Sequence, residues 1–246
     1  MASEKGHSPL DQFVINPIIE IQAGSADLSF TNSSLFMAIT VGVVTLLMLI
    51  GMRRRALVPG RLQSIAELSY GFISDMIRDN VGPRGRVYFP FVFTMFMFLL
   101  MGNLLGMIPY SFTFTSHIVV TFILALVVFI GVTVIGFAAN GPKFFKLFIP
   151  EGAPIFLLPL LIVIEVISYF VRPISLSLRL FANMMAGHTM LKVFGGFVLV
   201  LGVAGVLPIL ITVALTGLEV VVAILQAYVF TILSCLYLND AFHPGH

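Results

Sequence analysis

The stretch that decides the fold is IFLLPLLIVIEVISYFVRPISLSLRLFANMMAGHTMLKV, residues 155–193. It is apolar for most of its length, and a helix of about 40 residues rises about 60 Å at 1.5 Å per residue. Such a helix is about twice as long as the hydrocarbon core of a membrane is thick. It therefore either breaks, most simply at Arg172-Pro173, or lies steeply tilted in the membrane. The residues alone leave both alternatives open.

A polar stripe runs along this predicted helix. Its members recur every three or four residues and are Glu165, Ser168, Arg172, Ser175, Arg179 and Asn183. Residues at that spacing share one helix face. A charge in the middle of a bilayer is costly, so it faces protein or water and typically marks an ion path. His188 follows Arg179 by nine residues and therefore points about half a turn away, towards a different neighbour.

A second long apolar run covers residues 197–238, and its polar residues also lie near one face. They are Thr212, Thr216, Glu219, Gln226 and Tyr237, with Glu219 the only acid in the run. A carboxyl group beside His188 forms a pair that exchanges protons near physiological pH, as a proton relay requires. The alternative is a buried pair of Glu219 with a histidine or an arginine that only fixes helix packing. The polar stripe on the first long run, with Arg179 and Glu165, favours the relay.

The composition of the whole chain indicates an integral membrane protein. Of its 246 residues, 59% are hydrophobic and 10% charged, and the mean hydropathy is +1.09. A soluble domain carries about 25% charged residues. A cytosolic enzyme, a disordered chain and a disulfide-stapled secreted module are therefore excluded. The net charge of +2 is too small to indicate nucleic-acid binding, and the single cysteine closes no disulfide within the chain.

Three shorter apolar runs precede the two long ones. Each has about the length of 20 residues that a helix needs to cross a bilayer, and they cover residues 35–52, 87–108 and 117–139. Residues 61–80 have apolar positions at helical spacing and predict an amphipathic helix on the membrane interface. Residues 1–34 form a polar N-terminal segment without the pattern of a signal peptide. We therefore expect a single membrane domain over residues 35–246.

The basic residues predict the orientation of the chain. Arg53–Arg55 follow the first apolar run, and Lys143 and Lys146 follow the third. Because basic loops stay in the cytoplasm, both groups are expected there. The N-terminal segment is then outside and the C-terminus is cytoplasmic.

Three motifs resemble subunit a of the F-type ATP synthase. SLSLRLFANMMAGH at 175–188 is similar to the signature helix of that family, and GLEVVVAILQAYVF at 217–230 to its last helix; NLLGMIP at 103–109 is a weaker match. The resemblance runs from about Ser8 to Leu238. It implies that the two long helices lie nearly in the membrane plane around a ring of c subunits, which favours tilt over breakage. The expected fold is an all-α polytopic membrane protein with about three upright or moderately tilted spans, an interfacial amphipathic helix and a hairpin of two long, steeply tilted helices.

The resemblance also implies roles for individual residues. Arg179 falls at the essential arginine, which faces the carboxylate of the ring. The implied proton path, in two half-channels that open to opposite sides, is lined by Glu219, His188, Asn183, Gln226, Glu165 and Ser175, with Glu165 towards the cytoplasm. Some members of the family carry an acid at position 188 and a histidine at position 219. Here the two are exchanged, which preserves the chemistry of the pair.

The implied function is that of a proton-conducting stator that couples proton flow to rotation and ATP synthesis. The implied partners are the c-subunit ring, peripheral-stalk b-type subunits, the F1 ATPase sector, membrane lipid and the transported protons, in a bacterial plasma (inner) membrane; no nucleic acid is expected. The sequence contains no GxxxxGK[ST] loop, so a self-contained nucleotide enzyme is not expected, and neither is a cofactor or a metal. The alternative is a transporter or channel that acts alone, but no half of the chain is repeated. An intramembrane metalloprotease would need a His-Glu-x-x-His helix, which is also missing.

Overall fold

The computed structural model describes residues 13–20, 22–23, 26–27, 29–53, 58–108, 111–149, 156–201 and 205–242. The N-terminal part forms two short antiparallel pairs, β1 (Pro17–Ile19) with β4 (Phe30–Thr31) and β2 (Gln22–Ala23) with β3 (Ala26–Asp27). The rest of the description is helical: α1 (Asn32–Arg53), α2 (Arg61–Asn80), η2 (Pro83–Tyr88), α3 (Phe89–Gly106), η3 (Phe114–Ser116), α4 (Ile118–Asn140), η4 (Gly141–Phe148), α5 (Leu158–Leu201) and α6 (Val206–Phe242). Arg54 and Arg55 of the predicted basic group lie outside the described residues.

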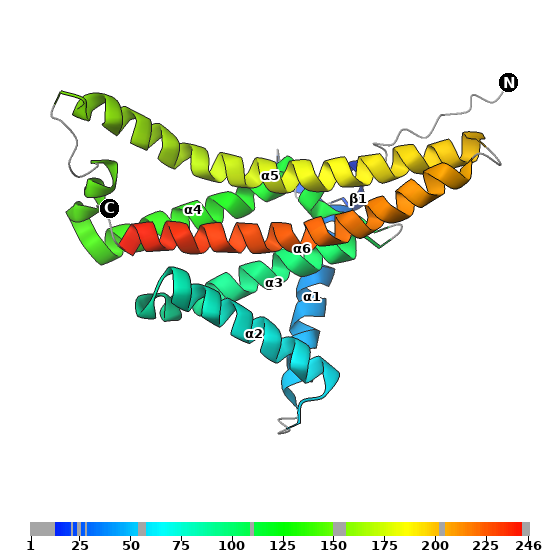
Figure 1. The fold of residues 1–246 in the computed structure, drawn as a ribbon, viewed down its shortest axis with the longest axis horizontal. Coiled ribbons are helices and arrows are strands. Elements are labelled where there is room, and N and C mark those ends of the chain that lie inside the picture. Colours follow the sequence, from blue (N-terminus) through cyan, green and yellow to red (C-terminus); the bar gives the residue numbers. More distant parts are fainter. Residues whose placement is uncertain are drawn as a thin grey trace.

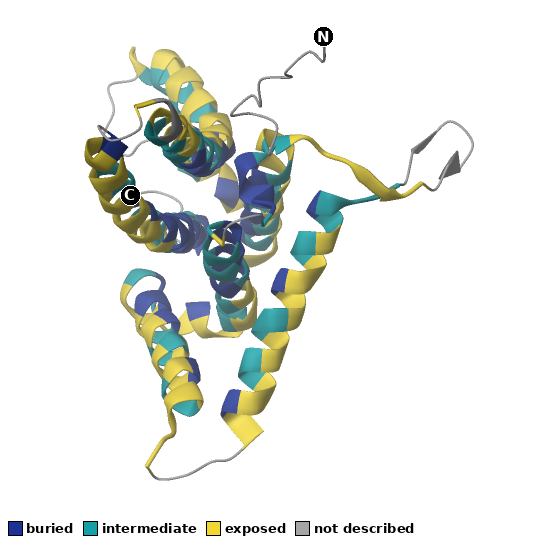
Figure 2. Ribbon diagram, turned by 90° about the vertical axis from the view of Figure 1, so that its right-hand side faces the viewer, coloured by how far each residue is buried: buried dark blue, intermediate teal, exposed yellow. Residues whose placement is uncertain are grey.

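Among the described helices, five are long and apolar enough to cross a membrane. They contain α1, α3, α4, α5 and α6, and they confirm the all-α polytopic fold class. Helices suit this environment because lipid offers no hydrogen-bond partner to an open backbone. Buried residues gather where α3 to α6 meet, and exposed residues lie on the outer faces (Figure 2). Many of these exposed residues are large and apolar.

The two long helices are unbroken. α5 has 44 residues and α6 has 37, and they lie side by side along the longest axis of the molecule (Figure 1). Pro173 lies inside α5 and removes one backbone donor, yet the helix continues through it. Neighbouring helices commonly compensate for such a proline in membrane proteins. The structure therefore excludes the break at Arg172-Pro173, and an unbroken α5 of about 66 Å is longer than an upright span requires.

The turn of this hairpin lies later in the chain than the sequence predicts. The predicted runs are separated at residues 193–197, around Gly195-Gly196, but α5 continues to Leu201 and α6 begins at Val206. Each glycine costs a helix only about 1 kcal/mol relative to alanine. In lipid, an interrupted helix would leave backbone groups without hydrogen bonds, which costs more. The glycine pair therefore does not end the helix.

α2 presents apolar side chains on two faces. Of the predicted apolar positions Leu62, Ile65, Leu68, Phe72 and Met76, only Met76 is buried. The buried face instead contains Ala66, Ile73 and Ile77 and packs against α1, α3 and α6. Periodicity misses this difference because protein-facing and lipid-facing positions are both apolar.

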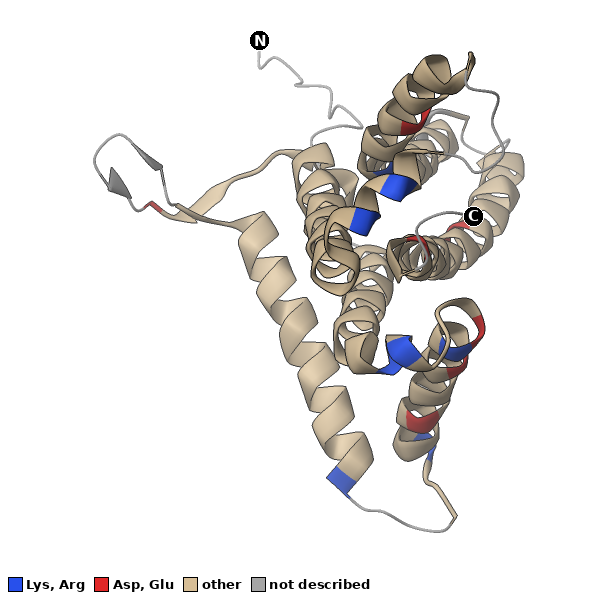
Figure 3. Cartoon of the chain, turned by 90° about the vertical axis from the view of Figure 1, so that its left-hand side faces the viewer, with Lys and Arg blue, Asp and Glu red and all other residues tan. Residues whose placement is uncertain are grey.

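The bundle has two distinct ends. At the first, which we call the basic end, the ring of Tyr88 lies 5.7 Å from that of Phe242, and the Asn140 side-chain amide donates to the carbonyl of Ala241 at 2.6 Å. These contacts join the ends of η2 and α4 to the end of α6, and η4, which follows α4, also lies against α6. The arginines of η2 and the lysines of η4 are therefore at this end. At the other, the loop end, Phe36 at the start of α1 packs 6.3 Å from Phe112, which precedes η3. Figure 3 shows that α1 carries no charge along its shaft, whereas charges gather around α2.

Candidate functional site

The structure brings His188 and Glu219 together between α5 and α6. His188 Nδ1 lies 3.2 Å from Glu219 Oε1, and the two residues are 9% and 5% exposed. Neither carboxyl oxygen accepts a hydrogen bond within the described part of the chain. The contact is therefore an acid and a base at close range, with the acid free of other polar partners there. This pair can exchange a proton.

Gly187 makes this approach possible. A Cβ atom at position 187 would lie 2.8 Å from Glu219 Oε1 and 3.1 Å from its Cδ. Any side chain there would displace the carboxyl group from His188. In the sequence Gly187 is only one position of the motif at 175–188, because its importance depends on a contact with another helix.

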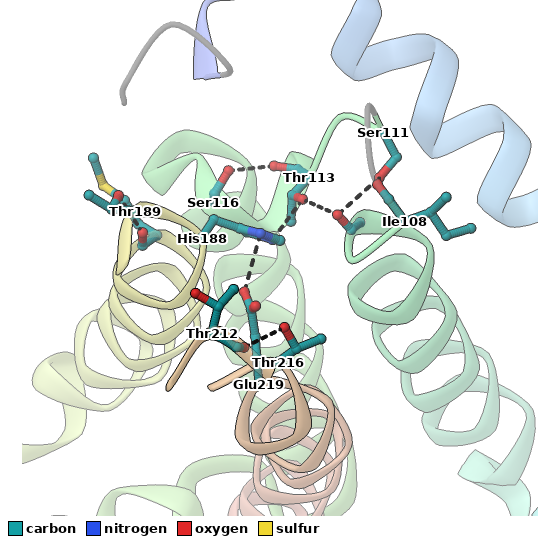
Figure 4. Close-up of polar contacts among 11 residues, drawn as sticks. Ile108, Ser111, Thr113, Ser116, His188, Thr189, Thr212, Thr216 and Glu219 are labelled. Carbon is teal, nitrogen blue, oxygen red and sulfur yellow. Dashed lines mark hydrogen bonds and ion pairs between the residues drawn. The ribbon is translucent and has the colours of Figure 1, made fainter. Parts of the chain in front are cut away.

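A chain of polar groups leads from the pair to the loop end (Figure 4). His188 Nε2 lies 2.9 Å from Thr113 Oγ1, and the Thr113 hydroxyl donates to the carbonyl of Gly106 at 2.9 Å. Ser111 Oγ lies 2.9 Å from the same carbonyl oxygen and 2.6 Å from that of Ile108, and it can donate its one proton to either. We call Glu219, His188 and Thr113 the Glu219 cluster. Sequence reasoning missed Thr113, although the run of hydroxyl residues between two apolar spans was a visible signal.

Arg179, unlike the buried pair of His188 and Glu219, lies on an exposed face. It is exposed on α5, as are Ser175 and Asn183, one turn before and one turn after it. Within the described ranges Arg179 makes no hydrogen bond or ion pair. Apolar neighbours such as Leu178, which is 44% exposed, surround it on this face. The arrangement leaves a permanent cation on an apolar surface without a counter-charge from these parts of the chain.

Two further predicted residues form a bridge between the long helices. The Asn183 side-chain amide donates to Gln226 Oε1 at 2.8 Å. Gln226 is buried, and its Nε2 has no hydrogen-bond partner among the described residues. The last predicted residue, Glu165, is half-buried on α5, and the described residues offer it no hydrogen bond or ion pair.

Arg172 is paired, which the sequence analysis does not foresee. Its Nη1 donates to Asp240 Oδ2 at 2.8 Å, and its guanidinium lies 5.6 Å from the ring centre of Tyr169 and 5.0 Å from that of Tyr237. We call these four residues the Arg172 cluster. Arg172 therefore has a counter-charge on α6. Asp240 was missed because it reads as part of a polar C-terminal tail.

The site offers acid–base chemistry. Among the described residues, no three His, Cys, Asp or Glu side chains lie close enough together to hold a metal ion. A carboxyl group, an imidazole and a line of hydroxyls instead lie in sequence from the middle of α6 towards the loop end. Such an arrangement suits the uptake and transfer of protons.

The comparisons with known proteins all indicate the same family. The model of the family described as ATP synthase A chain matches residues 34–239. ATP synthase subunit a of Parvibaculum lavamentivorans is 59% identical over 245 residues, which cover 97% of this chain and 94% of that protein. ATP synthase subunit a of Rhodospirillum rubrum is 58% identical, with 96% and 98% covered, and that of Pelagibacter ubique is 56% identical, with 97% and 99% covered.

Proposed function

The chain belongs to the ATP synthase A chain family, and on that premise we propose that it is the proton-conducting stator of an F-type ATP synthase in a bacterial plasma membrane. It is a non-catalytic membrane subunit, and its task is to couple proton flow to rotation. In this proposal two half-channels open to opposite sides of the membrane and meet a rotating ring of c subunits at Arg179.

The observation that carries the proposal is the state of Arg179. A guanidinium remains protonated at any accessible pH, and a charge in an apolar surface needs a counter-charge. The described residues provide none, and in this proposal a partner subunit does. A carboxylate on each c subunit fits, because Arg179 would favour its ionised form as it passes. The same charge would repel protons and keep the two half-channels apart.

The distribution of polar groups along α5 supports two half-channels. His188 is nine residues beyond Arg179, or about 14 Å along the helix, and it belongs to the Glu219 cluster near the loop end. Glu165 is 14 residues before Arg179, or about 21 Å, towards the basic end. We assign the Glu219 cluster to the outer half-channel and Glu165 to the cytoplasmic one. Ser175 and the Asn183–Gln226 bridge lie between them and line the path near Arg179.

The proposed cycle uses these groups in sequence. During synthesis a proton enters from the outside, passes between His188 and Glu219, and neutralises a ring carboxylate. The neutral carboxyl group then rotates through lipid, where an ionised one would be costly. On its return Arg179 favours its ionised form, and the proton leaves past Glu165 to the cytoplasm.

The contacts at the two ends support the proposed orientation. The basic segments η2 and η4 both lie near the end of α6, and the preference of basic loops for the cytoplasm assigns this end to that side. Residues 1–34 would then be outside and the C-terminus cytoplasmic. Cysteines introduced at Ser3 and at Lys146 should differ in their labelling from outside in intact cells, and equal labelling would contradict this orientation.

The partners follow from the same proposal. They are the c-subunit ring, b-type subunits of the peripheral stalk and, through that stalk, the F1 sector. A transporter or channel that acts alone is the competing function. It predicts purification without a ring oligomer or a soluble ATPase, whereas the stator should co-purify with both.

Substitution of Arg179 tests the proposal. In Arg179→Ala, ATP synthesis should vanish, because ring carboxylates are no longer driven to ionise at the interface. Passive proton leak through the membrane sector should persist or rise, since the barrier between the half-channels is gone. Glu67→Gln, which changes an exposed acid on α2 outside the proposed path, is the control and should retain most of the synthesis. Near wild-type synthesis by membranes that contain normal amounts of Arg179→Ala would refute the assignment.

A further inference from the structure

Thr113 contacts His188, and proton exchange between His188 and Glu219 does not require this contact. It lies between η3 and the end of α3, is 6% exposed, and places its hydroxyl 2.9 Å from His188 Nε2. A hydroxyl carries one proton, so it donates to one acceptor at a time and accepts with its lone pairs. Which partner receives that proton decides what Thr113 does to His188.

The carbonyl of Gly106 is a stronger acceptor for the Thr113 hydroxyl proton than His188 Nε2. Gly106 is the last residue of α3, so its carbonyl belongs to the negative end of the helix and lacks a partner within the helix. Thr113 Oγ1 lies 2.9 Å from this oxygen. The approach requires glycine, because a Cβ atom at position 106 would lie 2.6 Å from Thr113 Oγ1.

We propose that Thr113 is a positioning residue that holds neutral His188 in the tautomer with its proton on Nε2. With its own proton committed to Gly106, the Thr113 hydroxyl can only accept, and it accepts from His188 Nε2–H. His188 Nδ1 is then left without a proton, 3.2 Å from Glu219 Oε1. In this tautomer Nδ1 has a free lone pair, so protonated Glu219 can transfer its proton to it, which leaves a carboxylate beside an imidazolium with protons on both nitrogens.

The same geometry makes Thr113 an anchor and not a member of the proton path. A proton that passed from His188 through the Thr113 hydroxyl would have to move on to the carbonyl of Gly106, which is a very weak base. Proton exchange of His188 therefore takes place at Nδ1. This inference rests on the proposed function for its effect on proton flux, but the tautomer itself is a property of the molecule that can be measured separately.

The direct test is the tautomer of His188. The intact complex, with histidine labelled by 15N in the ring, is studied by solid-state NMR at alkaline pH, where imidazoles are neutral. The signals of His188 are those that disappear in His188→Asn. We expect the Nε2-protonated form in the wild type and a loss of this preference in Thr113→Val, which removes the hydroxyl and keeps the size. An Nδ1-protonated His188 in the wild type would overturn the proposal.

The functional test is proton flux in reconstituted complexes present in equal amounts. Thr113→Val should lower flux about 3- to 10-fold, as the loss of one hydrogen bond would, and Thr113→Ser should restore both flux and tautomer. Thr231→Val is the matched control, because Thr231 is also buried and, among the described residues, donates to the carbonyl of Ala227 in its own helix and to no other group. Complete loss of flux in Thr113→Val with an unchanged tautomer would show that Thr113 conducts protons, and would overturn the anchor.

The experiments distinguish a failure of the Thr113 assignment from a failure of the proposed proton relay. If Thr113→Val changes the tautomer while flux stays normal, and Glu219→Gln also leaves flux normal, the relay is wrong and the tautomer assignment stands. If Glu219→Gln abolishes flux while Thr113→Val changes neither flux nor tautomer, the relay stands and the role of Thr113 is wrong.

Discussion

The Glu219 cluster and the Arg172 cluster lie between the same two helices, near opposite ends of the bundle. In the Arg172 cluster every charge has a partner: Arg172 binds Asp240 and lies against two tyrosine rings. In the Glu219 cluster the carboxyl group is more deeply buried, yet the described residues give its oxygens no hydrogen bond. One cluster is electrostatically satisfied, and the other keeps an acid and a base in reach of each other.

The difference shows how to distinguish structural from chemical charges in a membrane protein. A buried charge that is fully paired holds helices together and gains nothing from changing its protonation state. A buried acid beside an imidazole, without further donors, gains or loses a proton when its surroundings change. We therefore expect substitutions in the Glu219 cluster to affect proton flux far more than assembly. In the Arg172 cluster the order should be reversed.

The largest effect is expected from the pair itself. Glu219→Gln and His188→Leu should each lower proton flux by about 100-fold or more, the usual size for loss of an acid–base group. The double variant should be little worse than either single one, because both act in one step. Proton pumping by reconstituted complexes is the measurement, with Glu67→Gln, an exposed acid on α2, as the control. Fully additive losses would contradict a shared step.

An intermediate effect is expected at Gly187. In Gly187→Ala the new methyl group would displace the Glu219 carboxyl from His188, and a displacement of about 1 Å can cost up to about 100-fold in rate. We expect flux to fall by about 10-fold or more with normal assembly. Gly195→Ala is the control in the same helix, because a Cβ atom there meets nothing within 4 Å. Equal behaviour of the two variants would show that the close approach is unimportant.

The smallest effect is expected in the Arg172 cluster. The side chains of Arg172 and Asp240 are 19% and 39% exposed, so solvent weakens their attraction, and we expect a coupling of about 1 kcal/mol or less. Arg172→Leu, Asp240→Asn and the double variant form a cycle, measured by the thermal stability of the assembled complex and by flux. Flux should change no more than a few-fold. A loss as deep as that of Glu219→Gln would instead place this cluster in the proton path.

Much of the fold was predictable because hydropathy is local. A run of about 20 apolar residues identifies a span wherever it lies, and α2 (Arg61–Asn80) begins and ends where its amphipathic pattern does. Neither the possible break at Arg172-Pro173 nor the predicted turn near Gly195 occurs, because α5 continues through both. Proline and glycine weaken a helix by amounts that a bilayer and neighbouring helices can outweigh.

The candidate site was predictable only in part. The spacing of the polar residues, with the resemblance, singled out His188 and Glu219, and the structure brings them into contact. The roles of Asp240 and Thr113 could not be predicted, since each is an ordinary polar residue near the end of an apolar run. Their importance arises from partners 68 and 75 residues away in the chain.

The sequence by itself determined that this chain is a bundle of membrane helices, because the cost of exposing polar backbone to lipid applies to each segment separately. It also determined which side chains are too polar to face lipid. Only the tertiary structure decided which of them meet. The distance between His188 and Glu219, the room that Gly187 leaves for the carboxyl group, and the carbonyl that takes the proton of Thr113 all depend on how α3, α5 and α6 pack. Packing is a property of the whole bundle, and no single helix encodes it.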